Sequence, residues 1–409
     1  MGTEKLTISM LGEKDHGKST LIGRLLMATG STTKERIADA REASKGKRFE
    51  PGYLLDSFSE ERQNEMTIDT TRAEIIWNKR MYELVDVPGH LELIKNMISG
   101  ASNANTAILL VSAKKEERFT KQSKRHLFLA TMLGIDSLVV AVNKMDTVSY
   151  DREVFNQINR EVRDYLDNIG FNGRVTFAPI SAYSNENLVK DTARMKWYNG
   201  EPLMKILEKY SSAKKRGSNK LRALVQDVYD TGETKAAFCM LYSGKINVGE
   251  EIHMEPSNRS ARVSKIHIKG RMANSALSGT NAAVEFKGNV LPSKGEVLYG
   301  VSMQNKPTNR FTSKVFAISR ITYTKKLTLK MNNNHVLLKG LHVKRIISPL
   351  TGQHSHPKSN SLISNSAAIV EFSLNTKWPV ERFEECEELG RFMLYTGSKL
   401  VGIGRIEEV

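Results

Sequence analysis

Residues 6–28 read LTISMLGEKDHGKSTLIGRLLMA: an apolar run, a polar loop with two glycines, and a stretch with helical periodicity. Within it, residues 12–19, GEKDHGKS, match the pattern G-x-x-x-x-G-K-[ST]. In this pattern glycine lets the backbone curl until its N–H groups converge on phosphate oxygens, and the following helix presents its N-terminus to the same anion. The stretch therefore predicts a strand over residues 6–11, a phosphate-binding loop, and a helix over residues 18–28.

The loop supplies the first candidate site residues. We expect Lys18 to reach the β- and γ-phosphates of a nucleotide and the Ser19 hydroxyl to bind Mg²⁺. The candidate nucleotide-binding residues of this segment are Gly12, Glu13, Lys14, Asp15, His16, Gly17, Lys18, Ser19 and Thr20.

A second motif, Asp86-Val-Pro-Gly-His90, follows a strand that begins near Tyr82. An aspartate at the carboxyl end of a neighbouring strand can hold Mg²⁺ through water. The Gly89 N–H can approach a γ-phosphate closely because glycine has no Cβ. His90 is the candidate catalytic residue, orienting the attacking water. A histidine alone is more simply a surface residue, but its place just after the strand-end aspartate favours the catalytic interpretation.

A third motif, Asn143-Lys-Met-Asp146, follows an expected strand over residues 138–142, and strand carboxyl ends form the ligand edge of an open α/β sheet. Asp146 can accept hydrogen bonds from N1–H and the exocyclic amine of guanine, which adenine cannot supply. Asn143 can bond the purine and the surrounding loop, and the alkyl stem of Lys144 can cover the base. Ser181 and Ala182, after another strand, fit a loop whose backbone N–H contacts the guanine carbonyl oxygen. The ligand predicted is GTP or GDP.

Thr67 is the remaining candidate. Its hydroxyl, between the phosphate loop and Asp86 in the sequence, would join Ser19 and Asp86 as a Mg²⁺ ligand only when the γ-phosphate is present, which makes residues 31–66 a switch segment. The other interpretation of this segment is an ordinary polar loop.

The first 210 residues alternate apolar runs with amphipathic stretches. The expected strands are 6–11, 73–77, 82–87, 107–111, 138–142 and 175–180, and the expected helices include 18–28, 91–99, 122–133 and 152–169. Such alternation is typical of an α/β domain with a mostly parallel sheet and helices on both faces. Residues 211–220, SSAKKRGSNK, are polar and basic and predict a linker.

Beyond the linker the pattern changes to short alternating strands separated by Gly, Asn and Ser turns. The expected strand-forming stretches are 221–228, 237–242, 251–254, 262–268, 282–286 and 297–300, and then 311–321, 336–347, 367–374 and 391–406. The spacing predicts one small antiparallel β-barrel over residues 221–305 and a second over 308–409. The predicted fold class is an α/β P-loop GTPase domain, residues 1–210, followed by two antiparallel β-barrel domains.

With these motifs in order, the chain resembles the translation elongation factor 1-alpha and elongation factor Tu family. The likeness is carried by GEKDHGKST, MTIDTTRAEI, DVPGHLELIKNMISGAS, VAVNKMD and PISAYSNEN, and farther on by VQDVYDTGE and ELGRFMLYTGSKLVGIGRIEEV. The long segment before Thr67 is similar to the archaeal and eukaryotic branch. The resemblance implies hydrolysis of GTP to GDP and phosphate, GTP-dependent delivery of a tRNA or tRNA-like cargo to the ribosome, an exchange factor, and the water-positioning role of His90.

Departures from the family pattern and alternative functions accompany this resemblance. The family usually has a small apolar residue, half of a hydrophobic gate, where Lys14 stands. A release- or rescue-type translational GTPase with a protein cargo is one alternative function. The GTPase subunit of sulfate adenylyltransferase is another, although that family usually carries Asp in place of His16, which favours translation.

Charge also points to a polyanionic partner such as tRNA or the ribosome. The chain has 61 Lys and Arg residues and 45 Asp and Glu residues, which gives a formal net charge of +16. The other interpretation of this excess is a basic surface that only helps solubility. No apolar run approaches the roughly 18–20 residues of a membrane span. Two cysteines, Cys239 and Cys386, are too few for a disulfide framework. We expect a cytoplasmic monomer without membrane contact.

The last predicted domain carries a basic stretch with Lys325, Lys326, Lys330, Lys339, Lys344 and Arg345, and farther on an acidic stretch with Glu381, Glu384, Glu385, Glu387 and Glu388. If Lys339, Lys344 and Arg345 share one face, they suit an RNA backbone. Alternatively, the basic and acidic stretches pair with each other within the domain, so that little net positive charge is left to attract RNA.

Overall fold

The protein is described by a computed structural model over residues 5–43, 50–54, 71–86, 104–211, 219–230, 235–288, 290–301, 303, 307–324, 326–332 and 334–409. The chain divides into two compact units, residues 1–212 with 349–353 and residues 213–348 with 354–409. The expected helix over 91–99 and residues 212–218 of the expected linker lie outside the described residues.

A six-stranded sheet in the order β2-β3-β1-β4-β5-β6 forms the centre of the first unit. Its strands are β1 (Lys5–Leu11), β2 (Thr71–Trp77), β3 (Arg80–Asp86), β4 (Thr106–Ser112), β5 (Ser137–Asn143) and β6 (Arg174–Pro179). All neighbours run parallel except β2 and β3. Every residue of β4 is buried, as expected for a parallel strand that is covered on both faces and therefore consists of one apolar run.

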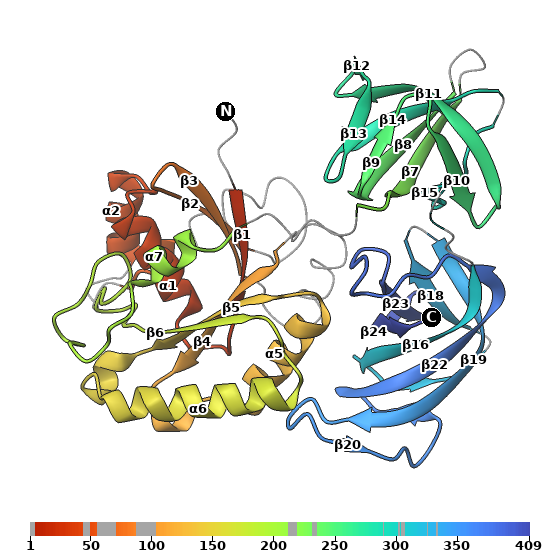
Figure 1. Cartoon of the computed structure of the whole chain (residues 1–409). Coiled ribbons are helices and arrows are strands. Elements are labelled where there is room, and N and C mark those ends of the chain that lie inside the picture. Colours follow the sequence, from red (N-terminus) through yellow and green to blue (C-terminus); the bar gives the residue numbers. More distant parts are fainter. Residues whose placement is uncertain are drawn as a thin grey trace. The chain divides into compact units, whose positions relative to one another are not determined.

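Helices cover both faces of this sheet (Figure 1). They are α1 (Lys18–Ala28), α2 (Lys34–Ala43), α5 (Lys121–Met132), α6 (Arg152–Asn168) and α7 (Leu203–Glu208), with 3₁₀ turns η1 (Lys115–Glu117) and η2 (Met145–Val148). The apolar residues of α1 and α7 join those of the strands in one core cluster. Thr120 and Asp151 cap α5 and α6 by accepting hydrogen bonds from the first-turn N–H groups of Ser123 and Glu153. The predicted α/β architecture is confirmed.

The second unit begins with an antiparallel sheet that closes on itself, because β10 pairs with both β15 and β11. Its strands are β7 (Arg222–Asp230), β8 (Lys235–Ser243), β10 (Glu251–Glu255), β11 (Arg259–Ile268), β12 (Arg271–Ala273), β14 (Asn281–Phe286) and β15 (Val297–Gly300), beside the small pair β9 (Lys245–Asn247) and β13 (Ser275–Leu277). The inward residues of these strands form a core cluster of their own. The first predicted barrel is confirmed.

A second barrel closes in the same way, since β18 pairs with both β23 and β19. Its strands are β16 (Thr308–Ala317), β18 (Leu327–Met331), β19 (Asn334–Ile347), β20 (His354–Ser355), β22 (Ser366–Trp378), β23 (Arg391–Thr396) and β24 (Lys399–Glu408), with β17 (Ile321–Thr322) paired to β21 (Ser361–Leu362). Phe311, Phe372 and Phe392 pack against one another inside it. The second predicted barrel is likewise confirmed.

The sequence prediction missed several strands of two to five residues. The longest of them is β18, in which apolar residues alternate with polar ones and Lys330 lies opposite His335 of β19. The stretch predicted over 391–406 consists of the hairpin β23–β24, which turns at Gly397, a residue with φ of +60°. Short strands are missed because a few residues give too little periodicity to recognise.

Inside the second unit, an ion pair and an apolar cluster join the two barrels. The guanidinium of Arg222, on β7, donates from Nε to Glu381 Oε1 over 3.0 Å and from Nη2 to Glu381 Oε2 over 3.1 Å. Leu224 and Tyr299 of the first barrel pack with Cys386 and Leu389 of the second. Among the described helices, none is both long and apolar enough to cross a bilayer.

Candidate functional site

The carboxyl ends of four neighbouring strands bring the first motif, Asp86 of the second motif and the third motif to one edge of the α/β sheet. In the register of β1 with β3, Met10 lies beside Asp86, and the loop that starts at Gly12 follows directly. In the register of β4 with β5, Ser112 lies beside Asn143. Because parallel strands end at a common edge, residues far apart in the sequence meet there.

The loop from Gly12 to Gly17 takes a backbone path that requires glycine at both ends. Gly12 has φ of +141°, and a Cβ on it would lie 2.9 Å from the carbonyl oxygen of Leu110. Gly17 has φ of +92°, and a Cβ there would lie 2.5 Å from Asn143 Nδ2. The loop is therefore packed against β4 and β5, and any side chain at these two positions would displace it.

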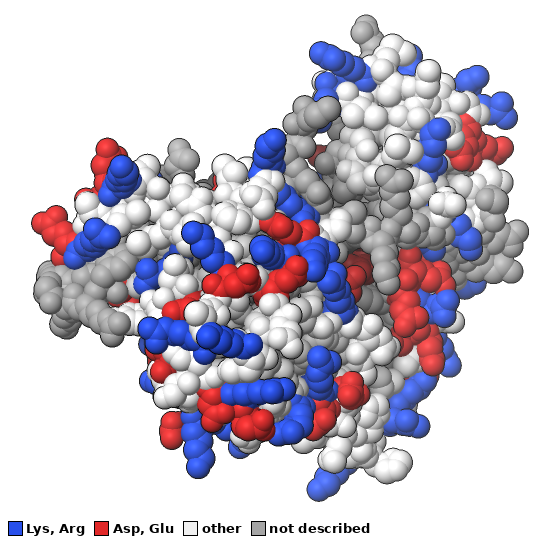
Figure 2. Space-filling model, turned by 60° about the vertical axis from the view of Figure 1, so that its left-hand side comes forward, with Lys and Arg blue, Asp and Glu red and all other residues white. Residues whose placement is uncertain are grey.

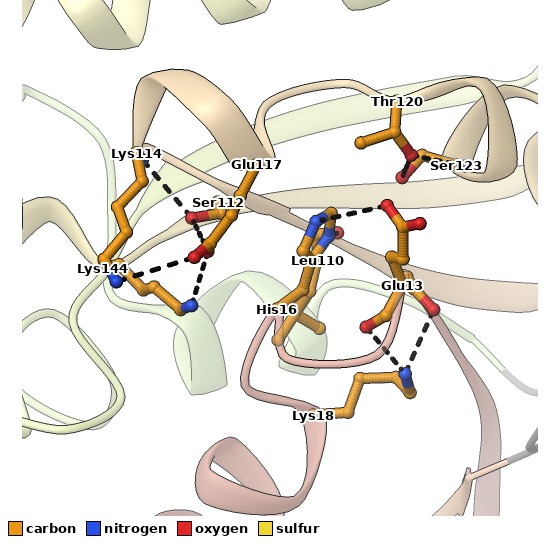
Figure 3. Close-up of polar contacts among 11 residues, drawn as sticks. Glu13, His16, Lys18, Leu110, Ser112, Lys114, Glu117, Thr120, Ser123 and Lys144 are labelled. Carbon is orange, nitrogen blue, oxygen red and sulfur yellow. Dashed lines mark hydrogen bonds and ion pairs between the residues drawn. The ribbon is translucent and has the colours of Figure 1, made fainter.

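Lys18 closes the loop across its own backbone. Its Nζ donates hydrogen bonds to the carbonyl oxygens of Gly12 at 3.0 Å and Glu13 at 3.1 Å (Figure 3). Burial lowers the pKa of Lys18, while the negative charges of Asp86, Asp15 and Glu13 raise it in part. A half-buried cation held over a loop beside three carboxylates can bind an anionic ligand that offers better acceptors than two carbonyl groups.

His16 serves the packing of the loop. Its side chain is almost fully buried, and Nδ1 lies 3.0 Å from the carbonyl oxygen of Leu110, so this nitrogen carries the proton. Nε2 lies 3.8 Å from Glu13 Oε2. Burial lowers the pKa of His16, which keeps the imidazole neutral near pH 7.

Asn143 ties two loops together. Its Nδ2 donates to the carbonyl oxygen of His16 at 2.9 Å, and its Oδ1 accepts from the N–H of Ala182 at 2.9 Å. The contact with surrounding loops that the sequence predicts for this side chain is thus present. A bond to the purine stays a prediction.

The lysine of the same motif is held by a residue of η1. Lys144 has φ of +64°, and its Nζ donates to Glu117 Oε2 at 2.6 Å. The Ser112 hydroxyl donates to the same oxygen at 2.8 Å (Figure 3). The hydrogen bond from Lys144 is the main cause that lowers the pKa of Glu117 to about 2, so the carboxylate is charged at neutral pH.

Asp146 and the 181–183 loop lie side by side. The Ser181 hydroxyl donates to Asp146 Oδ1 at 2.5 Å. Arg24, on α1, donates to the carbonyl oxygens of Ala182 at 3.2 Å and Tyr183 at 2.7 Å. The structure therefore brings together Asn143, Asp146, Ser181 and Ala182, which the sequence assigned to a purine base.

The other predicted residues fall in two groups. Lys14, Asp15 and Ser19 are exposed on or beside the loop, and the Thr20 hydroxyl donates to Glu50 Oε1 at 2.6 Å. Thr67, Gly89 and His90 lie outside the described residues.

Sequence reasoning missed two side chains that support this edge, Glu117 and Arg24. Glu117 lies in a charged run, KKEER, that gives no sign of which carboxylate turns inward. Arg24 lies on an otherwise apolar stretch of α1, and that isolated charge is the one signal that the sequence offers for it.

Comparison with protein families gives two matches. Residues 3–228 match the elongation factor Tu GTP binding domain, and residues 310–407 match the GTP-eEF1A C-terminal domain-like family. Among solved structures, those of sup35 complexed with GDP and with GMPPNP align with TM-scores of 0.44 and 0.45 and identities of 21% and 22%, covering 100% of this chain and 95% of each of those chains.

Full-length relatives are similar over the whole chain. Elongation factor 1-alpha of Saccharolobus solfataricus is 33% identical, with 99% of this chain and 97% of the relative covered. Elongation factor 1-alpha of Metallosphaera sedula is 32% identical over the same shares of the two chains. The likeness thus includes both barrels as well as the α/β unit.

Proposed function

The chain belongs to the elongation factor Tu and elongation factor 1-alpha family of GTP-hydrolysing translation factors, and on this premise we propose that it carries a tRNA or tRNA-like cargo to the ribosome while GTP is bound. Binding of GTP and its hydrolysis to GDP and phosphate follow from the family. The observation that supports the cargo is the length of the match to elongation factors 1-alpha, which extends through both barrels.

We assign the phosphates to the loop that Lys18 closes. A triphosphate entering there would replace the two carbonyl acceptors of Lys18, and the N-terminus of α1 adds partial positive charge. The proposed nucleotide-binding residues on this side are Gly12, Glu13, Lys14, Asp15, His16, Gly17, Lys18, Ser19, Thr20, Asp86 and Gly89.

In this proposal the guanine base binds at the carboxyl end of β5. Asp146 accepts from the guanine N1–H and amine, and Lys144 covers the ring. Asn143, Ser181 and Ala182 complete the pocket. Since the N–H of Ala182 already donates to Asn143, the guanine carbonyl oxygen would share that donor with the asparagine.

The residues present fit Mg²⁺. Ser19 lies exposed in the first turn of α1, and Asp86 lies beside Met10 of β1, two residues before the loop begins at Gly12, so a hydroxyl and a carboxylate lie near the same loop. Such oxygen donors suit this hard cation, which neutralises charge on the β- and γ-phosphates when bound. Thr67 is the third proposed ligand, and His90 is the proposed residue that orients the attacking water.

We assign the RNA backbone of the cargo to the exposed face of β19. Lys339, Lys344 and Arg345 are all exposed. Lys344 and Arg345 are both exposed although they are adjacent, because the register with β22 shifts between Val343 and Arg345. Lys344 pairs with Glu371 at 3.1 Å, whereas Glu381 and Glu385 contact Arg222.

On the face of the molecule shown in Figure 2, basic and acidic side chains are interspersed. A local basic strip such as that on β19 is therefore a better candidate for the polyanion than the overall net charge.

The test titrates the GTP-bound protein with tRNA at several salt concentrations. Wild-type protein is compared with the triple variant Lys339→Ala, Lys344→Ala, Arg345→Ala. If these side chains neutralise phosphates, the slope of log affinity against log salt should become shallower by roughly 0.7–0.9 for each phosphate that the variant leaves without a cation.

The control removes the same charge from three exposed lysines of the α/β unit, Lys190, Lys196 and Lys205. We expect the control to keep the wild-type slope. A GTP-bound protein without salt-dependent RNA binding, or a control variant whose slope falls as much as that of the β19 variant, contradicts an RNA cargo at this face. Co-purification of a release-factor-like protein, in place of tRNA, would instead support the alternative with a protein cargo.

A further inference from the structure

Glu117 lies at the end of η1, where it is surrounded by partners from two strand ends. Its Oε2 accepts from Lys144 at 2.6 Å and from Ser112 at 2.8 Å, and its Oε1 lies 3.5 Å from Lys114 Nζ (Figure 3). Ser112 itself is fully buried at the end of β4. The carboxylate is therefore fixed by the sheet, although the side chain is partly open to solvent.

Lys144 is fixed at its backbone by the start of η2, with φ of +64° and ψ of +30°. Its side chain is a flexible four-carbon stem, and a free lysine ammonium samples many rotamers, so the backbone alone does not decide where the stem lies. The pairing with Glu117 does decide it. The stem runs from the end of β5 toward the segment that follows β4, because Ser112 and Asn143 are neighbours in register.

We propose that Glu117 is a positioning residue for the guanine nucleotide: by holding the ammonium of Lys144 it keeps the alkyl stem of Lys144 against the base and so slows nucleotide release. This inference rests on the proposed role of Lys144 at the base. Glu117 does not touch the nucleotide, and it acts through Lys144 alone.

The location of the pair decides which nucleotides it affects. The pair lies at the base motif, whereas the phosphates belong to the loop around Lys18, so loss of Glu117 accelerates release of GDP and of GTP by the same factor. The carboxylate is charged throughout the neutral range, which makes this contact a permanent part of the site.

The experiment measures dissociation of fluorescent GDP and of a fluorescent non-hydrolysable GTP analogue from the full-length protein. Glu117→Gln keeps the shape and the acceptor for Ser112 but removes the charge. We expect release of both nucleotides to become roughly two- to fivefold faster, as for an ion pair that is partly exposed. Glu116→Gln, a neighbouring exposed carboxylate on the same 3₁₀ turn, is the matched control and should release both at the wild-type rate.

A double-variant cycle separates positioning from a general structural effect. Lys144→Met keeps an apolar stem without the ammonium, and we expect Glu117→Gln to change release no further in that background. Fully additive effects of the two substitutions would overturn the inference, as would a release rate unchanged in Glu117→Gln. Thermal unfolding of each variant checks that the chain is folded, and Glu117→Asp, which retains the charge, should release nucleotide more slowly than Glu117→Gln.

Failure of this inference differs from failure of the proposed site. If Asp146→Asn shifts preference from guanine to xanthine nucleotides while Glu117→Gln behaves as wild type, the base site stands and the positioning role of Glu117 is wrong. If Asp146→Asn leaves the guanine preference intact, the base site itself is wrong, and the inference is overturned with it.

Discussion

Two ion pairs, one in each unit, use the same chemistry in opposite surroundings. Lys144 and Glu117 at the edge of the α/β sheet have side chains 21% and 31% exposed and meet through one oxygen. Arg222 and Glu381 between the two barrels are 1% and 3% exposed and meet through two hydrogen bonds. The first pair can be remade by a small movement, whereas the second cannot separate without leaving a charge in the protein interior.

The difference in burial decides what each pair does. A partly exposed pair contributes about 0.2–1 kcal/mol to stability, because water solvates both charges when it opens. Removing one partner of a buried pair costs about 3–5 kcal/mol, since the other charge stays uncompensated. In the α/β unit, charge therefore holds the side chain of Lys144, the proposed cover of the base, whereas in the second unit a buried pair joins the two barrels.

The largest expected effect concerns nucleotide binding at the proposed base site of the α/β unit. Asp146→Asn exchanges an acceptor for a donor opposite the guanine amine. Because this removes two charge-assisted hydrogen bonds of roughly 1.5–3 kcal/mol each, GTP affinity should fall by two or more orders of magnitude and preference should shift toward xanthine nucleotides. Equilibrium titration with GTP, xanthosine triphosphate and ATP measures this. Equal affinity of wild-type protein for ATP and GTP would be incompatible with the assigned base site.

Next in size is the buried pair. Glu381→Gln should lower the free energy of unfolding of the full chain by up to about 3 kcal/mol, because the buried Arg222 guanidinium then keeps only its 3.3 Å contact with the partly exposed Glu385, while GTP affinity stays at the wild-type value. Chemical denaturation measures the change. Glu384→Gln, an exposed carboxylate in the same segment, is the control.

Glu117→Gln tests the partly exposed pair in the same way. It should lower the free energy of unfolding by less than about 1 kcal/mol. Equal destabilisation by Glu381→Gln and Glu117→Gln would show that burial does not separate the two pairs as argued.

The smallest effect is expected at Lys14. Its side chain is exposed on the phosphate loop, so Lys14→Val should change the basal GTPase rate by no more than about twofold. Single-turnover hydrolysis without partners measures this rate. A change of about tenfold, equivalent to about 1.4 kcal/mol in the barrier, would instead indicate that the ammonium acts on the reacting phosphate.

The sequence was sufficient wherever a pattern is local. Gly12, Gly17 and Lys18 stand at fixed spacing between an apolar run and a helix, and the loop forms there with positive φ at both glycines. The parallel strands were predictable because their continuous apolar runs indicate burial on both faces. The barrel strands were predictable because apolar and polar residues alternate along them. Thr67, Gly89 and His90 fall outside the described residues, so their roles rest on sequence alone.

By itself, then, the sequence determined the order of α/β domain and barrels, the phosphate loop, and the grouping of Asn143, Asp146, Ser181 and Ala182 at strand ends. Only the tertiary structure decided that Glu117 holds Lys144 and that Arg222 pairs with Glu381, 159 residues farther along the chain. The physical reason is that periodicity reports which face of an element is buried, whereas the choice of an ionic partner depends on which elements the folded chain brings within about 3 Å of each other.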